Sequence, residues 1–358
     1  MRASYRSGSE WTDLSSLRAP GAFRWLREVV RLAPFGGEHW GAAQVGVSVT
    51  VPLAVLLAAG RADLVAYAVF GALASVYGKD SARDARCVRQ AGVGCAMIVS
   101  VGLGVAVGDP RVQGAVPLAA LGLVSLLGYL ITRGTGWLPV PSLFLVFSTG
   151  TVAAQGQSAE RLPLALGVAA LAVTFSIAVG QVVAGLQREE RLDALLRAEG
   201  RSPFGGVGDG ALVALHVLVP TGAALLALGL GWGHAFWAAV AATVPLVGAT
   251  SSARGVRTAQ RAVGTIVGVL LAAFVLALEP STWALVLIVA TCQVVTELFV
   301  RRNYAIAVMA MTPMALLLSD LGSAHDAGRL VMDRLLCTLL GLAVSIVCVL
   351  VATATRRS

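Results

Sequence analysis

Beyond residue 38, long apolar runs alternate with short polar islands to the end of the chain. Each run has roughly 20 residues, which as a helix covers the ~30 Å hydrocarbon core of a bilayer. Backbone N–H and C=O groups cannot stay unpaired in lipid, so such runs must be helical. The pattern therefore predicts an all-α integral membrane protein with about twelve transmembrane helices. They are expected at residues 40–59, 62–78, 91–108, 114–131, 138–154, 163–186, 211–229, 234–250, 262–278, 282–299, 303–319 and 330–353.

The twelve runs form two similar sets of six. An acid–proline pair follows the third run of each set, as Asp109-Pro110 and as Glu279-Pro280, 170 residues apart. Because each set has an even number of runs, both sets enter the membrane in the same sense. We therefore expect two parallel six-helix repeats related by a pseudo-twofold axis along the membrane normal.

The runs also set the expected domain organisation. It comprises a cytoplasmic N-terminal segment (1–38), a first transmembrane half (39–186), a cytoplasmic linker (187–210) and a second transmembrane half (211–354). In the N-terminal segment, Phe23, Leu26 and Val30 share one helical face, and arginines occupy the opposite face. This pattern predicts an amphipathic helix lying on the inner membrane surface.

Basic residues predict the orientation of the chain. If all twelve runs cross, 22 of the 27 Lys and Arg lie on one side, four lie on the other, and Arg334 lies inside the last run. Loops rich in Lys and Arg remain in the cytoplasm. Both termini and the linker are therefore expected to be cytoplasmic, in a multi-pass protein of the cytoplasmic membrane.

Composition narrows the expected partners. Hydrophobic residues make up 57% of the chain and charged residues 13%, whereas a soluble domain has about a quarter charged residues. The net charge of +8 follows from the basic loops, so we expect a lipid bilayer and no nucleic acid as partner. The five cysteines form no Cys-x-x-Cys pair, and we expect neither a metal nor another cofactor.

Sequence motifs for ATP hydrolysis and common enzyme chemistry are missing. The stretch from Gly71 to Asp80 has the wrong spacing for a phosphate-binding loop, and Asp80 stands where Ser or Thr is required. The four histidines lack metal-ligand spacing, and there is no Gly-x-Ser-x-Gly elbow. The chain is therefore not expected to be an enzyme, and any transport must use a gradient or a partner.

Three stretches of the second half resemble one membrane-protein family. They are Arg261-Ala-Val-Gly-Thr-Ile-Val-Gly268, Arg301-Arg-Asn-Tyr-Ala-Ile-Ala-Val-Met-Ala-Met-Thr-Pro313 and Arg334-Leu-Leu-Cys-Thr-Leu-Leu-Gly341. They are similar to motifs of the fusaric acid resistance-like (FUSC) proteins of the aromatic acid exporter superfamily. The resemblance implies a secondary transporter that exports small organic carboxylic acids, aromatic ones among them. Two features differ from the family pattern: Cys337 stands where an acid is expected, and the linker replaces a large cytoplasmic domain.

Three arginines are candidates for binding an acidic substrate. Arg334 is the basic residue that lies well inside a predicted span, where its guanidinium could bind a carboxylate through two hydrogen bonds. The alternatives are that Arg334 extends outward to water or pairs with Asp333. Arg257 and Arg261 begin the ninth run at the inner side, where they either attract anions to the inner mouth or only fix the topology.

Other polar residues within or beside the runs have a structural as well as a functional interpretation. Tyr304 is either part of the substrate site or an anchor at the membrane interface. His216 either titrates near neutral pH or stays buried and neutral. Glu297 could carry a proton, but Arg301 follows at i+4, which predicts an ion pair.

Prolines mark a candidate substrate path. Pro52 and Pro220 fall near the middle of the first run of each half, while Pro141 and Pro313 fall in the fifth runs. A proline inside a helix frees the carbonyl four residues earlier, and freed carbonyls must point into the protein or a watered cavity. We expect the helices containing Pro52, Pro220 and Pro313 to bend and converge on one cavity near mid-membrane. The alternative is that these prolines only kink their helices.

Two other protein classes remain open on the sequence alone. A major-facilitator-type carrier shares the arrangement of two parallel six-helix halves, but the stretch after Gly78 fits that class poorly. A non-transporting membrane scaffold or channel subunit is the other, and a homo-oligomer is also open. The substrate, the coupling ion and the oligomeric state do not follow from the sequence.

Overall fold

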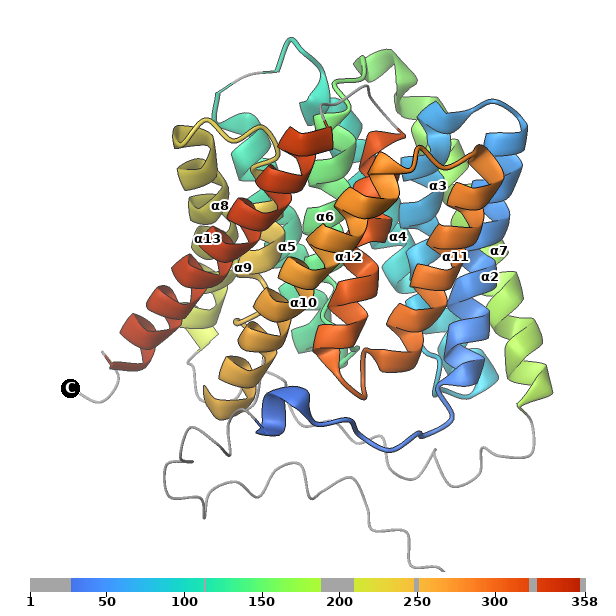
Figure 1. The fold of residues 1–358 in the computed structure, drawn as a ribbon, viewed down its shortest axis with the longest axis horizontal. Helices are drawn as coiled ribbons and strands as arrows, with labels where there is room; N and C mark the ends of the chain where they lie inside the picture. The colour runs from blue at the N-terminus through green and yellow to red at the C-terminus, as the bar shows by residue number, and fades with distance from the viewer. Residues whose placement is uncertain (1–26, 113, 188–208, 248–250, 322–326, 355–358) are drawn as a thin grey trace, which may run out of the picture.

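The computed structural model describes residues 27–112, 114–187, 209–247, 251–321 and 327–354. Within these ranges the regular secondary structure is entirely helical, and the helices form one bundle (Figure 1). The two described ends of the chain lie at the same end of this bundle in Figure 1. The all-α class predicted from the sequence is confirmed over the part of the chain that the structure describes.

Eight helices of the described chain are long and apolar enough to cross a bilayer. They correspond to the first, third, fourth and sixth predicted runs of each set. Their bounds are α2 (His39–Ala58), α4 (Arg83–Gly108), α5 (Val116–Thr135), α7 (Leu162–Leu186), α8 (Asp209–Gly229), α10 (Ser251–Ala277), α11 (Thr282–Phe299) and α13 (Ala327–Ala354).

The second and fifth runs of each set form shorter helices, so the structure differs from the predicted twelve full-length spans. These helices are α3 (Val65–Ala72), flanked by the 3-10 turns η2 (Ala62–Leu64) and η3 (Leu73–Val76), α6 (Ser142–Ala154), α9 (Phe236–Ala242) and α12 (Tyr304–Asp320). A hydropathy pattern detects a run of apolar residues but not the point within the run at which the backbone stops being helical. The predicted boundaries therefore merged short helices with the buried turns beside them.

The two shortest helices lie inside the bundle. Every residue of α3 and of α9 is buried, and the turns that follow them at 73–76 and 243–246 are buried as well. After η3 the backbone becomes extended at Tyr77 and takes a positive φ of 71° at Gly78. Interrupted backbone is tolerated at membrane depth only where protein surrounds it. The long helices around α3 and α9 supply that protection.

Helix packing follows the same scheme in both sets. In the first set, α4 packs against α6 and α7, and α3 packs against α2 and α7. In the second set, α10 packs against α12 and α13, and α9 packs against α8 and α13. The sets meet where α2 packs against α11 and where α5 packs against α8. These two contacts also use equivalent positions, the first helix of one set and the fourth helix of the other.

Small residues allow the closest helix contacts. A Cβ atom added to Gly341 of α13 would lie 2.2 Å from the carbonyl oxygen of Ala238 in α9. A Cβ atom added to Gly264 of α10 would lie 2.4 Å from the carbonyl oxygen of Ala305 in α12. Helices in membranes associate through such small-residue contacts because lipid gives no hydrophobic drive for association.

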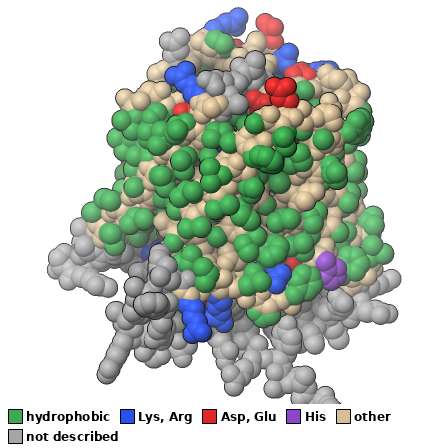
Figure 2. All heavy atoms as spheres, viewed as in Figure 1, with side chains coloured by type: hydrophobic (Ala, Val, Ile, Leu, Met, Phe, Trp, Pro, Cys, Tyr) green, Lys and Arg blue, Asp and Glu red, His purple; other side chains and the backbone are tan. Residues whose placement is uncertain are grey.

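The surface shows the polarity that a bilayer requires. Figure 2 shows hydrophobic side chains over the middle of the viewed face and charged side chains at its two ends. Leu171, Leu270 and Leu287 are each about two-thirds or more exposed on long helices. At one end, the Asp109 carboxylate accepts hydrogen bonds from the backbone N–H of Ala159 and of Arg111, which lowers the pKa of Asp109.

The N-terminal segment differs from the predicted interfacial helix. Phe23 and Leu26 lie outside the described residues; residues 27–30 form one helical turn. In that turn Val29 is buried and Val30 is exposed, so the described part docks on protein through Val29. Residues 27–38, here called the N-terminal strap, then lead into α2 across the end of the bundle (Figure 1).

Candidate functional site

Arg334 lies in the second turn of the described part of α13 and is buried, with only 2% of its surface exposed. Its guanidinium carbon lies 5.3 Å from the centre of the Trp237 ring on α9. Among the described residues, its Nε and Nη1 atoms have no hydrogen-bond partner. A buried guanidinium is costly unless its charge and its donors are satisfied. The position therefore calls for an acceptor that this part of the chain does not provide.

Arg261, on α10, is a second buried arginine, with 1% of its surface exposed. Its Nη1 donates to the Tyr304 hydroxyl at 3.0 Å, while its Nε has no acceptor within the described ranges. Arg257, one turn earlier, places its guanidinium 5.1 Å from the centre of the Tyr304 ring. The structure thus brings together three residues that the sequence singled out separately.

Arg261 and Arg334 lie near enough to repel each other electrostatically. Neither forms an ion pair with an acid of the described chain. Asp333, the partner considered for Arg334, instead bonds to His234 at 2.9 Å between Oδ2 and Nδ1. Arg334 also does not extend to water, because it is almost fully buried. Both alternatives for Arg334 are therefore at odds with the structure, and two positive charges share this region without a facing carboxylate.

Hydroxyl groups continue the polar face between α10 and α13, which pack against each other. Thr265 lies one turn after Arg261, and Ser345 lies three turns after Arg334 on the same side of α13. Both residues are buried, and their hydroxyl oxygens have no partner in the part of the chain described. Buried hydroxyl groups thus add to the unpartnered polar atoms of α10 and α13.

Arg86, at the start of α4, is also fully buried, but its donors are satisfied. Its Nη1 donates to Gln44 Oε1 at 2.7 Å and to the Gly180 carbonyl at 3.1 Å. Its Nε donates to the Gly78 carbonyl at 3.1 Å, and its Nη2 donates to the Lys79 carbonyl and to Gln187 Oε1. Arg86 therefore holds α2, α4, α7 and the turn at Gly78 together. No sequence pattern indicates this role, because Arg86 lies in an ordinary polar island.

The N-terminal strap lies against the N-terminal halves of α10 and α12. The Val29 carbonyl accepts hydrogen bonds from Gln260 Nε2 at 3.0 Å and from Asn303 Nδ2 at 3.1 Å. Ala33 and Arg302 exchange two further hydrogen bonds of 3.0 Å, through the backbone and through Arg302 Nε. Gln260 and Asn303 directly precede Arg261 and Tyr304 in the sequence. The strap therefore contacts α10 and α12 at the residues that directly precede Arg261 and Tyr304.

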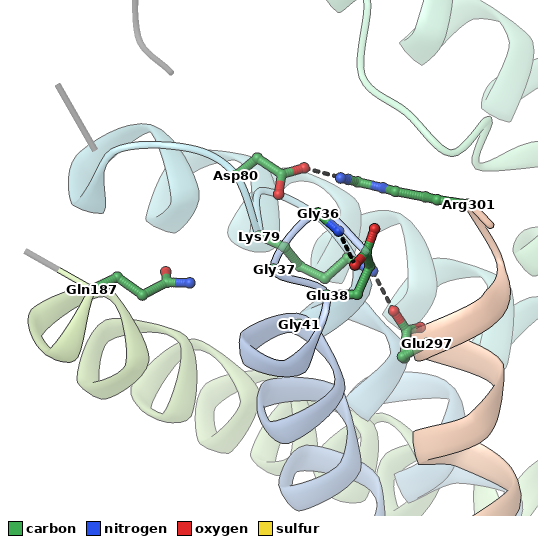
Figure 3. A pocket seen from close by; sticks show the side chains of 9 residues that line it. All are labelled: Gly36, Gly37, Glu38, Gly41, Lys79, Asp80, Gln187, Glu297 and Arg301. Atoms are coloured by element: carbon green, nitrogen blue, oxygen red, sulfur yellow. Dashed lines mark hydrogen bonds and ion pairs between the residues drawn. The ribbon is translucent and has the colours of Figure 1, made fainter. Parts of the chain in front are cut away.

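A charged cluster joins the two sets at the same end of the bundle (Figure 3). Lys79 pairs with Glu297, and Asp80 pairs with Arg301. The predicted ion pair between Glu297 and Arg301 is thus wrong, because each residue pairs with an opposite charge in the turn after η3. The spacing of residues along one helix cannot reveal partners from another segment. The cavity beside these pairs has a volume of about 30 Å³, room for a few waters but not for an aromatic acid.

The prolines lie inside or beside the helices as expected, but their convergence remains a prediction. Pro52 lies within α2 and is half-buried. Pro220 lies within α8 and Pro313 within α12, and both are buried. Pro141 immediately precedes α6. The Met309 carbonyl freed by Pro313 faces Gly268, since a Cβ added there would lie 2.9 Å from this oxygen. None of these prolines lines the cavity of Figure 3.

His216 lies at the contact between α5 and α8. It is buried, its Nδ1 lies 2.9 Å from the Leu212 carbonyl oxygen, and its ring stacks on Tyr129 with centroids 4.4 Å apart. These contacts belong to the boundary between the two sets. A role for His216 in binding a substrate stays a prediction.

An all-helical bundle with eight spanning helices and an apolar middle defines an integral membrane protein that crosses the bilayer many times. Residues 222–348 match the family model described as fusaric acid resistance protein-like. The match covers most of the second set of helices, and it confirms the resemblance expected from the motifs. Arg261, Tyr304, Trp237 and Arg334 all lie within the matched residues.

One curated relative is the uncharacterized membrane protein YvaC of Bacillus subtilis (strain 168). The two sequences are 30% identical over 112 residues, which is 31% of this chain and 18% of the relative. The aligned part of this chain thus spans less than a fifth of the relative's length. No solved structure matches this chain.

Proposed function

We propose that this protein is a secondary transporter of the cytoplasmic membrane that exports small organic carboxylic acids, aromatic ones among them, as anions. One observation carries the proposal: Arg261 and Arg334 are buried close together with free donors and no facing acid in the described chain. A carboxylate satisfies both the charge and the paired donors of a guanidinium. In this proposal the chain is not an enzyme, and a gradient supplies the energy.

The two arginines would act in sequence along the second set of helices. Arg261 lies about 15 Å along α10 from its inner end, at 1.5 Å per residue. Arg334 lies about 10 Å along α13 from the opposite end. An anion attracted by Arg257 and Arg261 could therefore move to Arg334. The rings of Tyr304 and Trp237 beside these arginines offer apolar faces to the rest of the substrate.

The two sets would be parallel repeats that move relative to each other. The shared packing scheme and the shared positions of the short helices support two six-helix repeats about an axis along the membrane normal. Because Arg86 ties α2, α4 and α7 together, the first set would be the more rigid of the two sets. The pairs Lys79–Glu297 and Asp80–Arg301 join the sets at the inner end, so they must part when the path opens inward.

The test replaces Arg334 with Leu and with Lys and measures benzoate efflux from proteoliposomes. Both variants should lose at least tenfold in rate, because a charged hydrogen bond contributes about 1.5–3 kcal/mol and Lys lacks the planar fork. Arg329→Leu is the matched control, since Arg329 is exposed five residues earlier on the same helix and should leave efflux unchanged. Wild-type efflux by Arg334→Leu at equal protein content would refute the proposed site.

A further inference from the structure

His234 and Asp333 form a buried carboxylate–imidazole pair near the end of the bundle opposite the strap. His234 Nδ1 and Asp333 Oδ2 lie 2.9 Å apart, and both residues are less than a tenth exposed. Gly233 leaves room for the carboxylate, because a Cβ there would lie 3.3 Å from Asp333 Oδ2. The Cys337 thiol, 3.6 Å from the His234 carbonyl oxygen, holds the histidine backbone against α13.

This pair is connected to Arg334 by direct contacts. The His234 ring stacks on Trp237, with centroids 4.8 Å apart and planes 19° from parallel. Trp237 also contacts the Arg334 guanidinium, whose carbon lies 5.3 Å from the ring centre. Asp333 and Arg334 are also consecutive residues of α13. A change in the charge of the pair is therefore felt at Arg334 across a single aromatic ring, with little water between to screen it.

We propose that His234 and Asp333 form a proton-binding site that sets the anion affinity of Arg334; this rests on the proposed function. With one proton shared between them, the pair has a net charge of zero and leaves the charge of Arg334 uncompensated. When that proton is lost, the pair has a net charge of −1 and competes with a carboxylate for Arg334. Proton binding and anion binding therefore reinforce each other, and by linkage the His234–Asp333 pair takes up a proton when the anion binds.

The consequence is that an acid would pass this point together with one proton, as a net neutral species. The proton comes from water on the side from which the anion is bound, and it leaves to water with the anion on the other side. Among the described residues, the other titratable or charged groups on α13 and on the helices packed against α9 and α13 are Arg329, Arg334, Cys337 and Cys348 on α13 itself, His216 on α8, Arg254, Arg257 and Arg261 on α10, and Tyr304 and Asp320 on α12. None of these repeats the carboxylate–imidazole arrangement within the described residues.

The experiment measures benzoate binding by calorimetry to the full chain in nanodiscs, from about pH 6 to pH 9, where benzoate stays ionised. Wild-type affinity should rise on the order of tenfold as the pH falls, with proton uptake visible in buffers of different ionisation enthalpy. Asp333→Asn should keep the high affinity at every pH and lose the proton uptake. His39→Gln, an exposed histidine at the strap, should behave as wild type. A wild-type affinity independent of pH, or an unchanged pH dependence in Asp333→Asn, would overturn the proposal.

A second readout works without any anion. The histidine ring nitrogen signals of labelled protein are followed against pH, and the His234 signal is assigned by its loss in His234→Gln. It should titrate in the wild type, and its midpoint should move in Asp333→Asn. A signal that stays constant over the same range would overturn the proton site. If wild-type protein binds no benzoate at any pH, the proposed function fails, and this titration still decides the present inference.

Discussion

Buried arginines in this protein differ in how their donors are used. Arg86 donates to neutral oxygens at every nitrogen, whereas Arg261 and Arg334 retain donors without acceptors in the described chain. A satisfied guanidinium holds backbone segments together, and an unsatisfied one keeps its charge available. This contrast separates a structural arginine from a binding one without reference to where either lies in the sequence.

The contrast predicts opposite effects on stability. Arg86→Leu should lower the thermal unfolding midpoint by roughly 5–10 °C, because it leaves several buried acceptors unpaired at about 1–3 kcal/mol each. Arg334→Leu should leave the midpoint unchanged or raise it, since it removes a buried charge that has no partner. Thermal unfolding of the purified proteins in detergent, followed by tryptophan fluorescence, checks both. An Arg334 variant that is destabilised more than the Arg86 variant would assign Arg334 to the scaffold.

Among helices, the contact between α9 and α13 positions Trp237 beside Arg334. It depends on Gly341, whose place no larger residue can take without moving the Ala238 backbone. Every residue of the short α9 is buried, and α9 packs against α6, α8 and α13, so its contact with α13 is one of three that fix its position.

Gly341→Ala should therefore destabilise the protein and reduce benzoate affinity together. Gly167→Ala in α7 is the matched control, because a Cβ atom there meets nothing within 4 Å. The control should be neutral or more stable by at most about 1 kcal/mol, the helix propensity gained by Ala over Gly. Thermal unfolding and calorimetry on the two variants measure both quantities. Equal behaviour of the two variants would show that the contact does not position α9.

The sequence predicts which segments of the chain form helices, but it does not predict how long each helix is. All twelve apolar runs contain helix, because the hydropathy of about 20 residues is a strong signal. The breaks after α3 and α9 were missed because the broken backbone consists of apolar residues such as Leu73 and Val244. Of the site residues, Arg334 was found as a basic residue inside a predicted span, and Arg261 and Tyr304 were found as polar residues where predicted spans begin. Trp237, His234 and Arg86 were missed, since their roles depend on contacts between distant segments.

The whole molecule is organised as two sets of helices that share one packing scheme and meet through ion pairs at one end. Most basic residues of the described chain lie toward that end, and the N-terminal strap lies across it (Figure 1). This arrangement predicts that the end with the strap faces the cytoplasm.

Cysteine labelling in intact cells tests this orientation in a chain freed of its native cysteines. A cysteine at Ala59, exposed after α2, should react with a membrane-impermeant maleimide added outside. A cysteine at Gly134, exposed near the C-terminal end of α5, should react only after the cells are opened. Outside labelling at Gly134 and not at Ala59 would reverse the proposed direction of transport.

The central claim is that an organic anion binds between Arg261 and Arg334. The most direct measurement is a structure of the full chain with 4-iodobenzoate, in which the iodine is located by its anomalous scattering. We predict an iodine peak between α10 and α13 beside Trp237, with the carboxylate on Arg334, and no peak in Arg334→Leu. A peak confined to the charged cluster at Lys79 and Arg301, or a peak that persists in Arg334→Leu, would contradict the claim.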